Sequence, residues 1–409
     1  MFQTQQIRQN FNFHTKYSTQ FKDNTFVFRF LIPMTQHNIN CAQVYSQLLD
    51  DRSIKAPTKQ AMLRWMDELY DASFGSYLTT YGQSFVLSVV FKGIEGKIVN
   101  DPEQNHRFIS WMMMILEGVL VNKETLKEAK TNVLQNVKRE QEQHVKYALA
   151  LSAARYENTS YALRVDGDES VNNISLQDIH DFSQLLKQVA CDTYHIGQFD
   201  ESVILDALKQ SFLFQDKVKS PSYTLLKANP LPRLSVKKFS PQTILVKTYA
   251  THVDYQDSRY LAYRVGAIAF GSLPTSLLFT NIREKNSLCY FIHASVIAFD
   301  GVMNVITGIE SDKVDVVSTM IDEQFEAMKD IDDSLLDQAK QMMIHSLVSS
   351  DDDVMSAINL HYSSSLKGDE FNIESISKKI NELKREQILE AIALSECIGE
   401  FVLLGENDA

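Results

Sequence analysis

The chain has 409 residues, of which 44% are hydrophobic and 22% are charged, a composition typical of a globular protein with room for two or more domains. Its formal net charge of -12 argues against a nucleic-acid or anionic-membrane partner, because either partner favours a basic surface.

In chain order, the hydrophobic pattern of the first half predicts strands at 24–32, 85–91 and near 189–196, and helices at about 42–49, from Pro57, at about 104–121 and at 123–153. The first strand is indicated by the alternation of Phe26, Phe28 and Phe30 with other residues. In the second half we expect a strand over Val302–Ile309 and a helix from Val354. Hairpin-like neighbouring strands among helices favour an α+β fold, with a mostly antiparallel sheet and helices packed on one side.

The ends of the chain and its cysteines bear on location. Residues 1–12 are polar and lack the apolar core of a signal peptide. The most apolar run, 111–121, is interrupted by Glu117 and is shorter than the ~20 residues that span a bilayer. The four cysteines form no C-x-x-C pair, which is typical of reduced thiols. We therefore expect a cytoplasmic protein with no membrane association.

A linker is predicted between residues 217 and 242, because half of the chain's eight prolines fall there. It divides the chain into a first domain at 1–216 and a second domain at 243–409. Three pairs of similar segments recur in the same order in both halves, at offsets of 210 to 215 residues: Leu69–Leu78 with Arg283–Ile292, Gly93-Ile94 with Gly308-Ile309, and Leu126–Lys130 with Leu336–Lys340. The order and near-constant offset predict a duplicated domain.

The common catalytic motifs are absent from the sequence. It contains no G-x-S-x-G, no G-x-G-x-x-G and no P-loop. A helical zinc site needs two imidazoles one turn apart, and no two of the ten histidines are four residues apart. His37 and Cys41 have that spacing, but a single pair without nearby carboxylates favours packing over metal binding. Asp351–Asp353 is interpreted as a helix cap, with a metal-binding acidic cluster as the less favoured alternative.

The candidate functional residues are Arg283 and Tyr290, at the junction between a predicted helix and a predicted strand. An Arg presents a fixed fork of N–H donors and a Tyr presents one hydroxyl, so together they can hold a peptide carbonyl or carboxylate. The alternative for such a pair in isolation is a surface Arg beside a half-buried Tyr.

The surrounding motif resembles the insulinase/pitrilysin/mitochondrial-processing-peptidase superfamily, the inverzincins. Its second-half signature is matched at eight positions: Gly271, Ser276, Leu278, Phe279, Arg283, Glu284, Leu288 and Tyr290. In the first half, Tyr161, 165–171 and 174–182 resemble a further segment of the family. The resemblance implies two homologous α+β halves that face each other as a clamshell.

The chain departs from the active members of that family at the metal. Those members carry H-x-x-E-H on the first helix of the first half and a third ligand, a Glu, on a later helix. The corresponding positions here are Gln43–Gln47 and Asn136, and the motif occurs nowhere in the sequence. The departure removes zinc binding, water activation and the general base together. We therefore expect no cofactor in this chain.

In active members, the residues corresponding to Arg283 and Tyr290 orient the substrate carbonyl over the zinc. The resemblance therefore implies a metal-free subunit of a heterodimeric zinc peptidase, inactive alone, whose homologous partner carries H-x-x-E-H and the zinc. The substrate would be a peptide or small protein, and a homodimer in the partner's absence stays open.

Two other interpretations remain. One is a non-catalytic scaffold or peptide-binding protein of the same fold, and the other, less favoured, is an independent enzyme with a different site. Among bacterial members, the chain most resembles the firmicute subunit associated with the 5-aminopentanol modification of elongation factor P.

Overall fold

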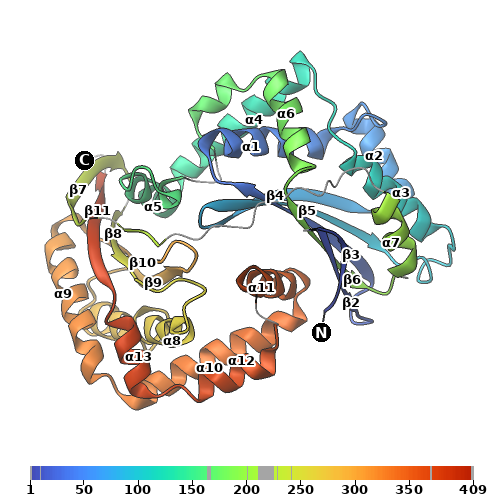
Figure 1. Ribbon diagram of the computed structural model, residues 1–409. Coiled ribbons are helices and arrows are strands. Elements are labelled where there is room, and N and C mark those ends of the chain that lie inside the picture. The colour runs from blue at the N-terminus through green and yellow to red at the C-terminus, as the bar shows by residue number, and fades with distance from the viewer. Residues whose placement is uncertain are drawn as a thin grey trace. The chain divides into compact units, whose positions relative to one another are not determined.

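The computed structural model describes residues 2–9, 11–163, 167–199, 201–210, 225–227, 229–240, 242–368 and 371–406. By packing, the chain divides into two compact units. The first unit comprises Met1–Arg139 and Leu163–Ser222, and the second comprises Glu140–Ala162 and Tyr223–Ala409. Each unit contains one sheet and its own helices (Figure 1).

The sheet of the first unit has six strands, in the order β1 (Gln3–Arg8), β2 (Phe11–Tyr17), β6 (Ala190–Gly197), β3 (Asp23–Pro33), β5 (Ser84–Ile94) and β4 (Ser73–Tyr81). Strands β2 and β6 are parallel, and every other pair is antiparallel. The predicted phenylalanine alternation is confirmed, since Phe26, Phe28 and Phe30 of β3 are buried in one core.

Helices cover one face of this sheet (Figure 1). They are α1 (Gln36–Asp51), α2 (Lys59–Glu68), α3 (Gln104–Leu116), α4 (Lys123–Glu142), α6 (Leu176–Leu186) and α7 (Glu201–Gln210), with the short turn η2 (Glu169–Asn173) just before α6. Helix α2 begins after Thr58, whose side chain accepts a hydrogen bond from the backbone N–H of Ala61, as the Pro57-Thr58 pair predicted.

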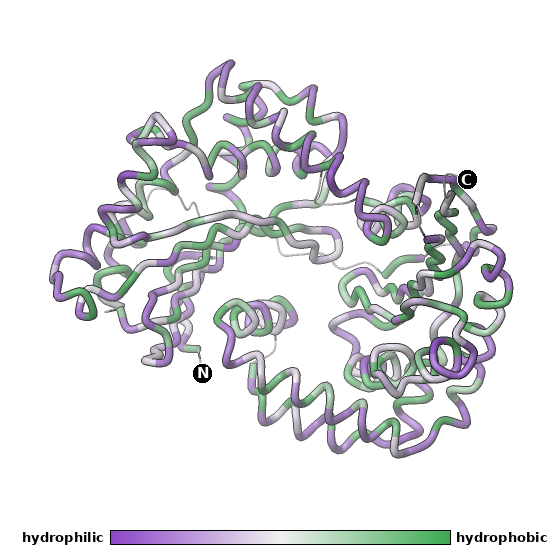
Figure 2. Tube along the Cα trace, turned by 180° about the vertical axis from the view of Figure 1, so that it is seen from behind, coloured by the Kyte–Doolittle hydropathy of each residue, from purple (hydrophilic) through white to green (hydrophobic). Residues whose placement is uncertain are grey.

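The sheet of the second unit has five strands, in the order β7 (Leu231–Phe239), β11 (Glu396–Glu406), β8 (Thr243–Ala250), β10 (Val302–Ile309) and β9 (Phe291–Ile297). Its main core lies between Leu245, Met303 and Val305 of the sheet and the helices α8 (Tyr260–Gly271), α9 (Val314–Glu326), α10 (Asp333–Ser349), α12 (Ile373–Asn381) and α13 (Arg385–Ile392). The outer helices alternate hydrophilic and hydrophobic residues along their turns, as expected for helices with one buried face (Figure 2).

The other face of this second sheet is covered from an earlier part of the chain. Helix α5 (His144–Ala154) places Ala148 against Ile244, Val246 and Phe401. Tyr161, in the short turn η1 (Ser160–Ala162), donates its hydroxyl hydrogen to Asn304 Oδ1 of β10 at 3.1 Å. Residues 140–162 therefore belong by packing to the second unit, although they precede the predicted linker.

The two sheets repeat one strand order. Strands β2, β6, β3, β5 and β4 correspond to β7, β11, β8, β10 and β9: in both sets the first pair is parallel and the next three pairs are antiparallel. This agreement supports the predicted duplication, and it confirms the α+β class with mostly antiparallel sheets. The boundaries 1–216, 217–242 and 243–409 stay a prediction about the homologous halves.

Several predicted boundaries were wrong. The helix predicted over 123–153 is in fact two helices, which are separated by the extended residue Gln143. The polar residues 138–142 before it have no apolar stripe that could hold one continuous helix against a single core. Helix α1 begins at Gln36 instead of 42, because Thr35 caps it. Helix α3 ends at Leu116. The predicted linker contains β7, while its residues 217–224 lie outside the described residues.

In the second half, Asp353 caps α11 (Val354–Lys367), as predicted: its side chain accepts a hydrogen bond from Ser356 N at 2.7 Å. The short turns η4 (Ser311–Lys313), η5 (Ala327–Asp330) and η6 (Ser350–Asp352) complete this region. All four cysteines are free. Within the described ranges, no helix is long and apolar enough to cross a membrane.

Candidate functional site

Arg283 lies in a π-helical turn, η3 (Phe279–Glu284), and Tyr290 immediately precedes strand β9. The widened turn is marked by a hydrogen bond from Lys285 N to Thr280 O at 3.0 Å, a spacing of five residues. Single π-turns of this kind occur often at functional sites. The sequence predicted a junction of helix and strand here, and the structure confirms it.

Buried side chains and backbone hydrogen bonds hold the turn in place. Leu278 and Ile282 are fully buried in the core of the second unit. Leu288 N donates to Ile282 O at 3.1 Å, which ties the end of the loop back to the turn. Tyr290 N donates to Gly308 O of β10 at 2.8 Å, which fixes the backbone just before β9. The backbone of both candidate residues is therefore held by hydrogen bonds and buried neighbours.

The side chains of both residues are exposed. Arg283 is exposed, and Tyr290 has 54% of its surface accessible. The Arg283 guanidinium lies over the ring of Phe279, 4.7 Å from the ring centroid. Over the part of the chain that the structure describes, neither the guanidinium nor the phenol has a hydrogen-bond or ion-pair partner. Their donors are thus available to a bound group.

Cys289 lies between the two residues in the chain and is half-buried. Burial raises the pKa of its thiol, while a hydrogen bond with Thr307 and the charge of Arg283 oppose that rise. The thiol is therefore protonated at neutral pH and is no nucleophile.

Gly271 of α8 lies at the contact between α8, the residue before η3 and strand β9. A Cβ atom at this position would lie 2.8 Å from Leu278 Cδ1, which precedes η3, and 2.7 Å from the Cβ of Ala294 in β9. Helix α8 can approach both only because this residue has no side chain. The glycine of the motif therefore has a packing role, which a sequence pattern alone does not reveal.

The positions predicted to correspond to zinc ligands lie on α1 and α4. A Cβ atom on Gly167 would contact Gln43 of α1 at 3.6 Å and Val133 of α4 at 3.7 Å, so the two helices meet beside this glycine. The side chains there are amides and hydroxyls: Gln43, Ser46, Gln47 and the exposed Asn136. Ser46 shares a hydrogen bond with Ser76 of β4 at 2.6 Å. Such neutral groups do not provide a zinc site, which uses His, Cys or carboxylate ligands.

His37 and Cys41 form a contact that the sequence only partly anticipated. Cys41 Sγ lies 3.6 Å from His37 Nε2, and the same nitrogen lies 3.6 Å from Asp178 Oδ1 of α6. The expectation of no nearby carboxylate was therefore wrong. Burial, together with the charges of Asp178 and Asp181, raises the pKa of the Cys41 thiol to about 12, so it is not the thiolate that binds metals. No cluster of His, Cys, Asp or Glu suited to a metal ion occurs among the described residues.

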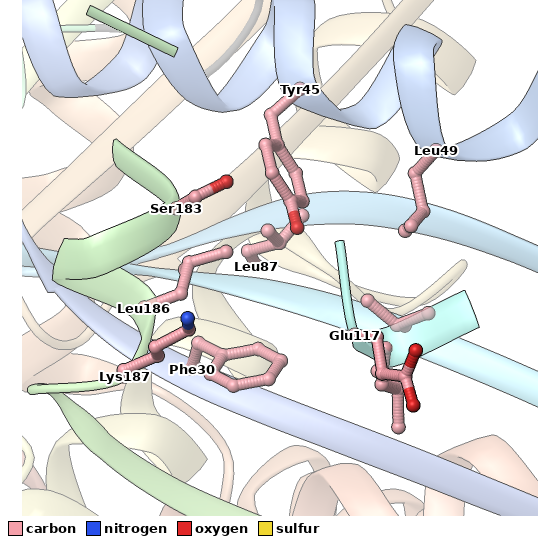
Figure 3. A pocket seen from close by; sticks show the side chains of 10 residues that line it. Phe30, Tyr45, Leu49, Leu87, Glu117, Ser183, Leu186 and Lys187 are labelled. Carbon is pink, nitrogen blue, oxygen red and sulfur yellow. The ribbon is translucent and has the colours of Figure 1, made fainter. Parts of the chain in front are cut away.

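Two cavities are lined by residues of the first unit, and neither Arg283 nor Tyr290 is among their lining residues. The first, of about 30 Å³, is lined by Tyr45 of α1, Phe30 of β3 and Leu186 of α6 (Figure 3). It has room for one or two water molecules but not for a peptide. The second is a groove of about 680 Å³ beside α2 and α3, and Arg107 in its lining is already paired with Asp101 at 2.5 Å.

Comparison with known proteins places these features in a family. The profile described as "Peptidase M16 inactive domain" matches residues 173–343, a range that includes both Arg283 and Tyr290. The protein named "Probable inactive metalloprotease YmfF" of Bacillus subtilis (strain 168) is 25% identical over 400 residues, which cover 92% of each chain. Both matches fit a member of the insulinase superfamily that lacks the family's zinc motif.

Solved structures show the same fold. A conserved protein from Enterococcus faecalis V583 superposes with a TM-score of 0.91 and 21% identity, over 100% of this chain and 99% of that one. A peptidase M16 inactive domain from Pseudomonas fluorescens superposes with a TM-score of 0.83 and 15% identity, over 99% of this chain and 98% of that one. The family profile and the Bacillus relative support the resemblance predicted from the motif, and the solved structures confirm the fold. The roles of Arg283 and Tyr290 stay predictions.

Proposed function

We propose that this chain is the metal-free subunit of a two-chain zinc peptidase, and that Arg283 and Tyr290 hold the scissile carbonyl of a peptide over the zinc of the partner subunit. The observation that carries the proposal is the pair of exposed donors on anchored backbone, in a chain whose sequence contains no H-x-x-E-H motif. Zinc in the partner would supply the activated water.

The chemistry required of this chain is charge stabilisation and orientation. Peptide hydrolysis develops negative charge on the carbonyl oxygen, and donors fixed in advance stabilise that charge without reorganisation. Arg283 offers a charged N–H fork, and Tyr290 offers one O–H. Both groups act on the substrate, so neither needs a metal in the same chain.

The test is a peptidase assay of this chain co-purified with a homologue that carries H-x-x-E-H. The substrate is an internally quenched peptide selected from a random library by cleavage with the wild-type pair. Arg283→Ala is expected to lower kcat/KM by about 10²–10³-fold, and Tyr290→Phe by about 10-fold, because each substitution removes a donor from the reacting carbonyl.

The matched control is Lys285→Ala. Lys285 is an exposed cation of the same loop, and its Nζ donates to Asn281 Oδ1 at 2.9 Å. Its replacement is expected to leave kcat/KM within about twofold of wild type, since it has no assigned role at the carbonyl. If all three variants cleave equally well, the pair has no catalytic role.

A second candidate is a non-catalytic scaffold or peptide-binding protein. The word "inactive" occurs both in the family description and in the name of the Bacillus relative, and it favours this second candidate. This alternative predicts that complex formation survives the Arg283 and Tyr290 substitutions and that no peptide from the library is cleaved. The likeness to a subunit associated with elongation factor P modification stays a prediction under either candidate.

A further inference from the structure

Phe279 is an aromatic residue with an unusual position. Leu278, which precedes the turn, and Ile282, within it, are fully buried and belong to the core of the second unit. Phe279 is only partly buried and is not among the described hydrophobic residues packed against that core. Its recorded ring contact is with the guanidinium of Arg283, 4.7 Å from the ring centroid. The ring therefore supports Arg283 and does not fill the core.

Arg283 needs such a support if it acts by position. An exposed Arg side chain samples many rotamers, and ordering it costs conformational free energy. Carboxylates usually provide the fixed partner, but the described structure gives Arg283 no ion pair. A carboxylate partner would also occupy the N–H fork, whereas an aromatic ring leaves the edge of the guanidinium open to a ligand.

The geometry of the turn favours the contact between the Phe279 ring and the Arg283 guanidinium. Residues 279 and 283 are four apart in a π-turn, so their side chains lie on the same side of the widened helix. The backbone beneath is held by the hydrogen bonds from Lys285 N to Thr280 O and from Ser287 N to Arg283 O, at 3.0 and 3.1 Å. The ring and the guanidinium are thus presented together on one rigid turn.

We propose that Phe279 is a positioning residue for Arg283: its ring holds the guanidinium plane so that the N–H fork points away from the turn toward a bound carbonyl. The inference rests on the proposed function for its catalytic consequence. The stacking itself is a statement about this chain alone, and it is tested separately.

The catalytic test is a double-mutant cycle in the two-chain enzyme, with the same quenched peptide. Phe279→Leu is expected to lower kcat/KM about threefold to tenfold by loosening the guanidinium, while Phe279→Tyr, which keeps the ring, stays within about twofold of wild type. In an Arg283→Ala background, Phe279→Leu is expected to have no further effect, because its influence passes through Arg283.

Leu277→Ala is the matched control for loss of packing. Leu277 is partly buried, packs against the core of the second unit and precedes the turn. Its replacement is expected to change kcat/KM by the same factor whether or not Arg283 is present. If Phe279→Leu behaves in that way, Phe279 acts through the fold and the inference is wrong.

The structural test is NMR of the chain with labelled arginine side chains. The ring current of Phe279 is expected to displace the Arg283 side-chain resonances, and Phe279→Leu is expected to return them toward the values of an exposed Arg. Unchanged resonances would overturn the inference, whatever the peptidase assay gives. If instead the resonances respond but Arg283→Ala leaves cleavage unchanged, the stacking holds and the proposed function fails.

Discussion

The substitution Gly271→Ala tests the packing that links the two candidate residues. The new Cβ atom would lie 2.7 Å from Ala294 Cβ, 2.8 Å from Leu278 Cδ1 and 2.9 Å from Ala294 N. Carbon atoms in ordinary contact are at least about 3.5 Å apart, so the neighbours must retreat by at least roughly 0.6–0.8 Å. Because one of them is the backbone of β9, a rotamer change cannot relieve the overlap.

The expected cost follows from two opposing effects. Overpacking of a core costs about 1–3 kcal/mol of unfolding free energy, and Ala in place of Gly at the end of α8 returns at most about 1 kcal/mol. We expect a net loss of roughly 1–2 kcal/mol, measured by the urea midpoint. In the two-chain assay the displaced turn should lower kcat/KM by about tenfold, because small misplacements of positioning groups are costly.

Gly266→Ala in the same helix is the control. The three atoms nearest to its Cβ atom would all belong to the side chain of Ile392, at 3.0–3.4 Å. We expect its unfolding free energy within about 0.5 kcal/mol of wild type and no loss of cleavage. A Gly271→Ala protein as stable as the Gly266→Ala protein would refute the close approach.

Two further predictions concern stability. Burial between aromatic rings lowers the pKa of His195 to about 3. Its neutral form therefore adds stability that is complete above about pH 6.5 and is lost as the pH falls toward 3, at up to about 1.4 kcal/mol per pH unit. His195→Phe should weaken the pH dependence of the urea midpoint between pH 6.5 and 4.5, and an unchanged pH dependence would contradict the burial argument. Asp353→Ala removes the cap of α11 and should lower the free energy of unfolding by about 1 kcal/mol, measured in the same way. The control Asp330→Ala changes an exposed residue that is not a helix cap and should lower it by less than about 0.5 kcal/mol. Equal losses of unfolding free energy would show that the cap is not the cause.

The sequence predicted the elements whose patterns are local. The strand around Phe28, the helix after Pro57 and the cap at Asp353 were recovered because alternation, proline and capping chemistry act over a few residues. Strands β1, β2 and β11 were missed: β1 and β2 lie in a polar N-terminal segment, and β11 is recognisable only from its pairing with β7 and β8.

The candidate site was recoverable only in outline. The motif identified Arg283 and Tyr290, but not why neighbouring positions are constrained. The role of Gly271 depends on its distance from Ala294, 23 residues later in the chain. The carboxylate beside His37 comes from Asp178, which tertiary packing brings to α1. Contacts between distant residues of this kind leave no local pattern.

The central claim is that this chain completes the active site of a partner, and a titration tests it most directly. A fixed amount of the H-x-x-E-H subunit is mixed with increasing wild-type chain, and the rate of cleavage of the quenched peptide is recorded. The account predicts a rate that rises and saturates at one chain per partner, and that stays about 10²–10³-fold lower with the Arg283→Ala chain at saturation. Equal saturating rates with the wild-type and Arg283→Ala chains would contradict the account.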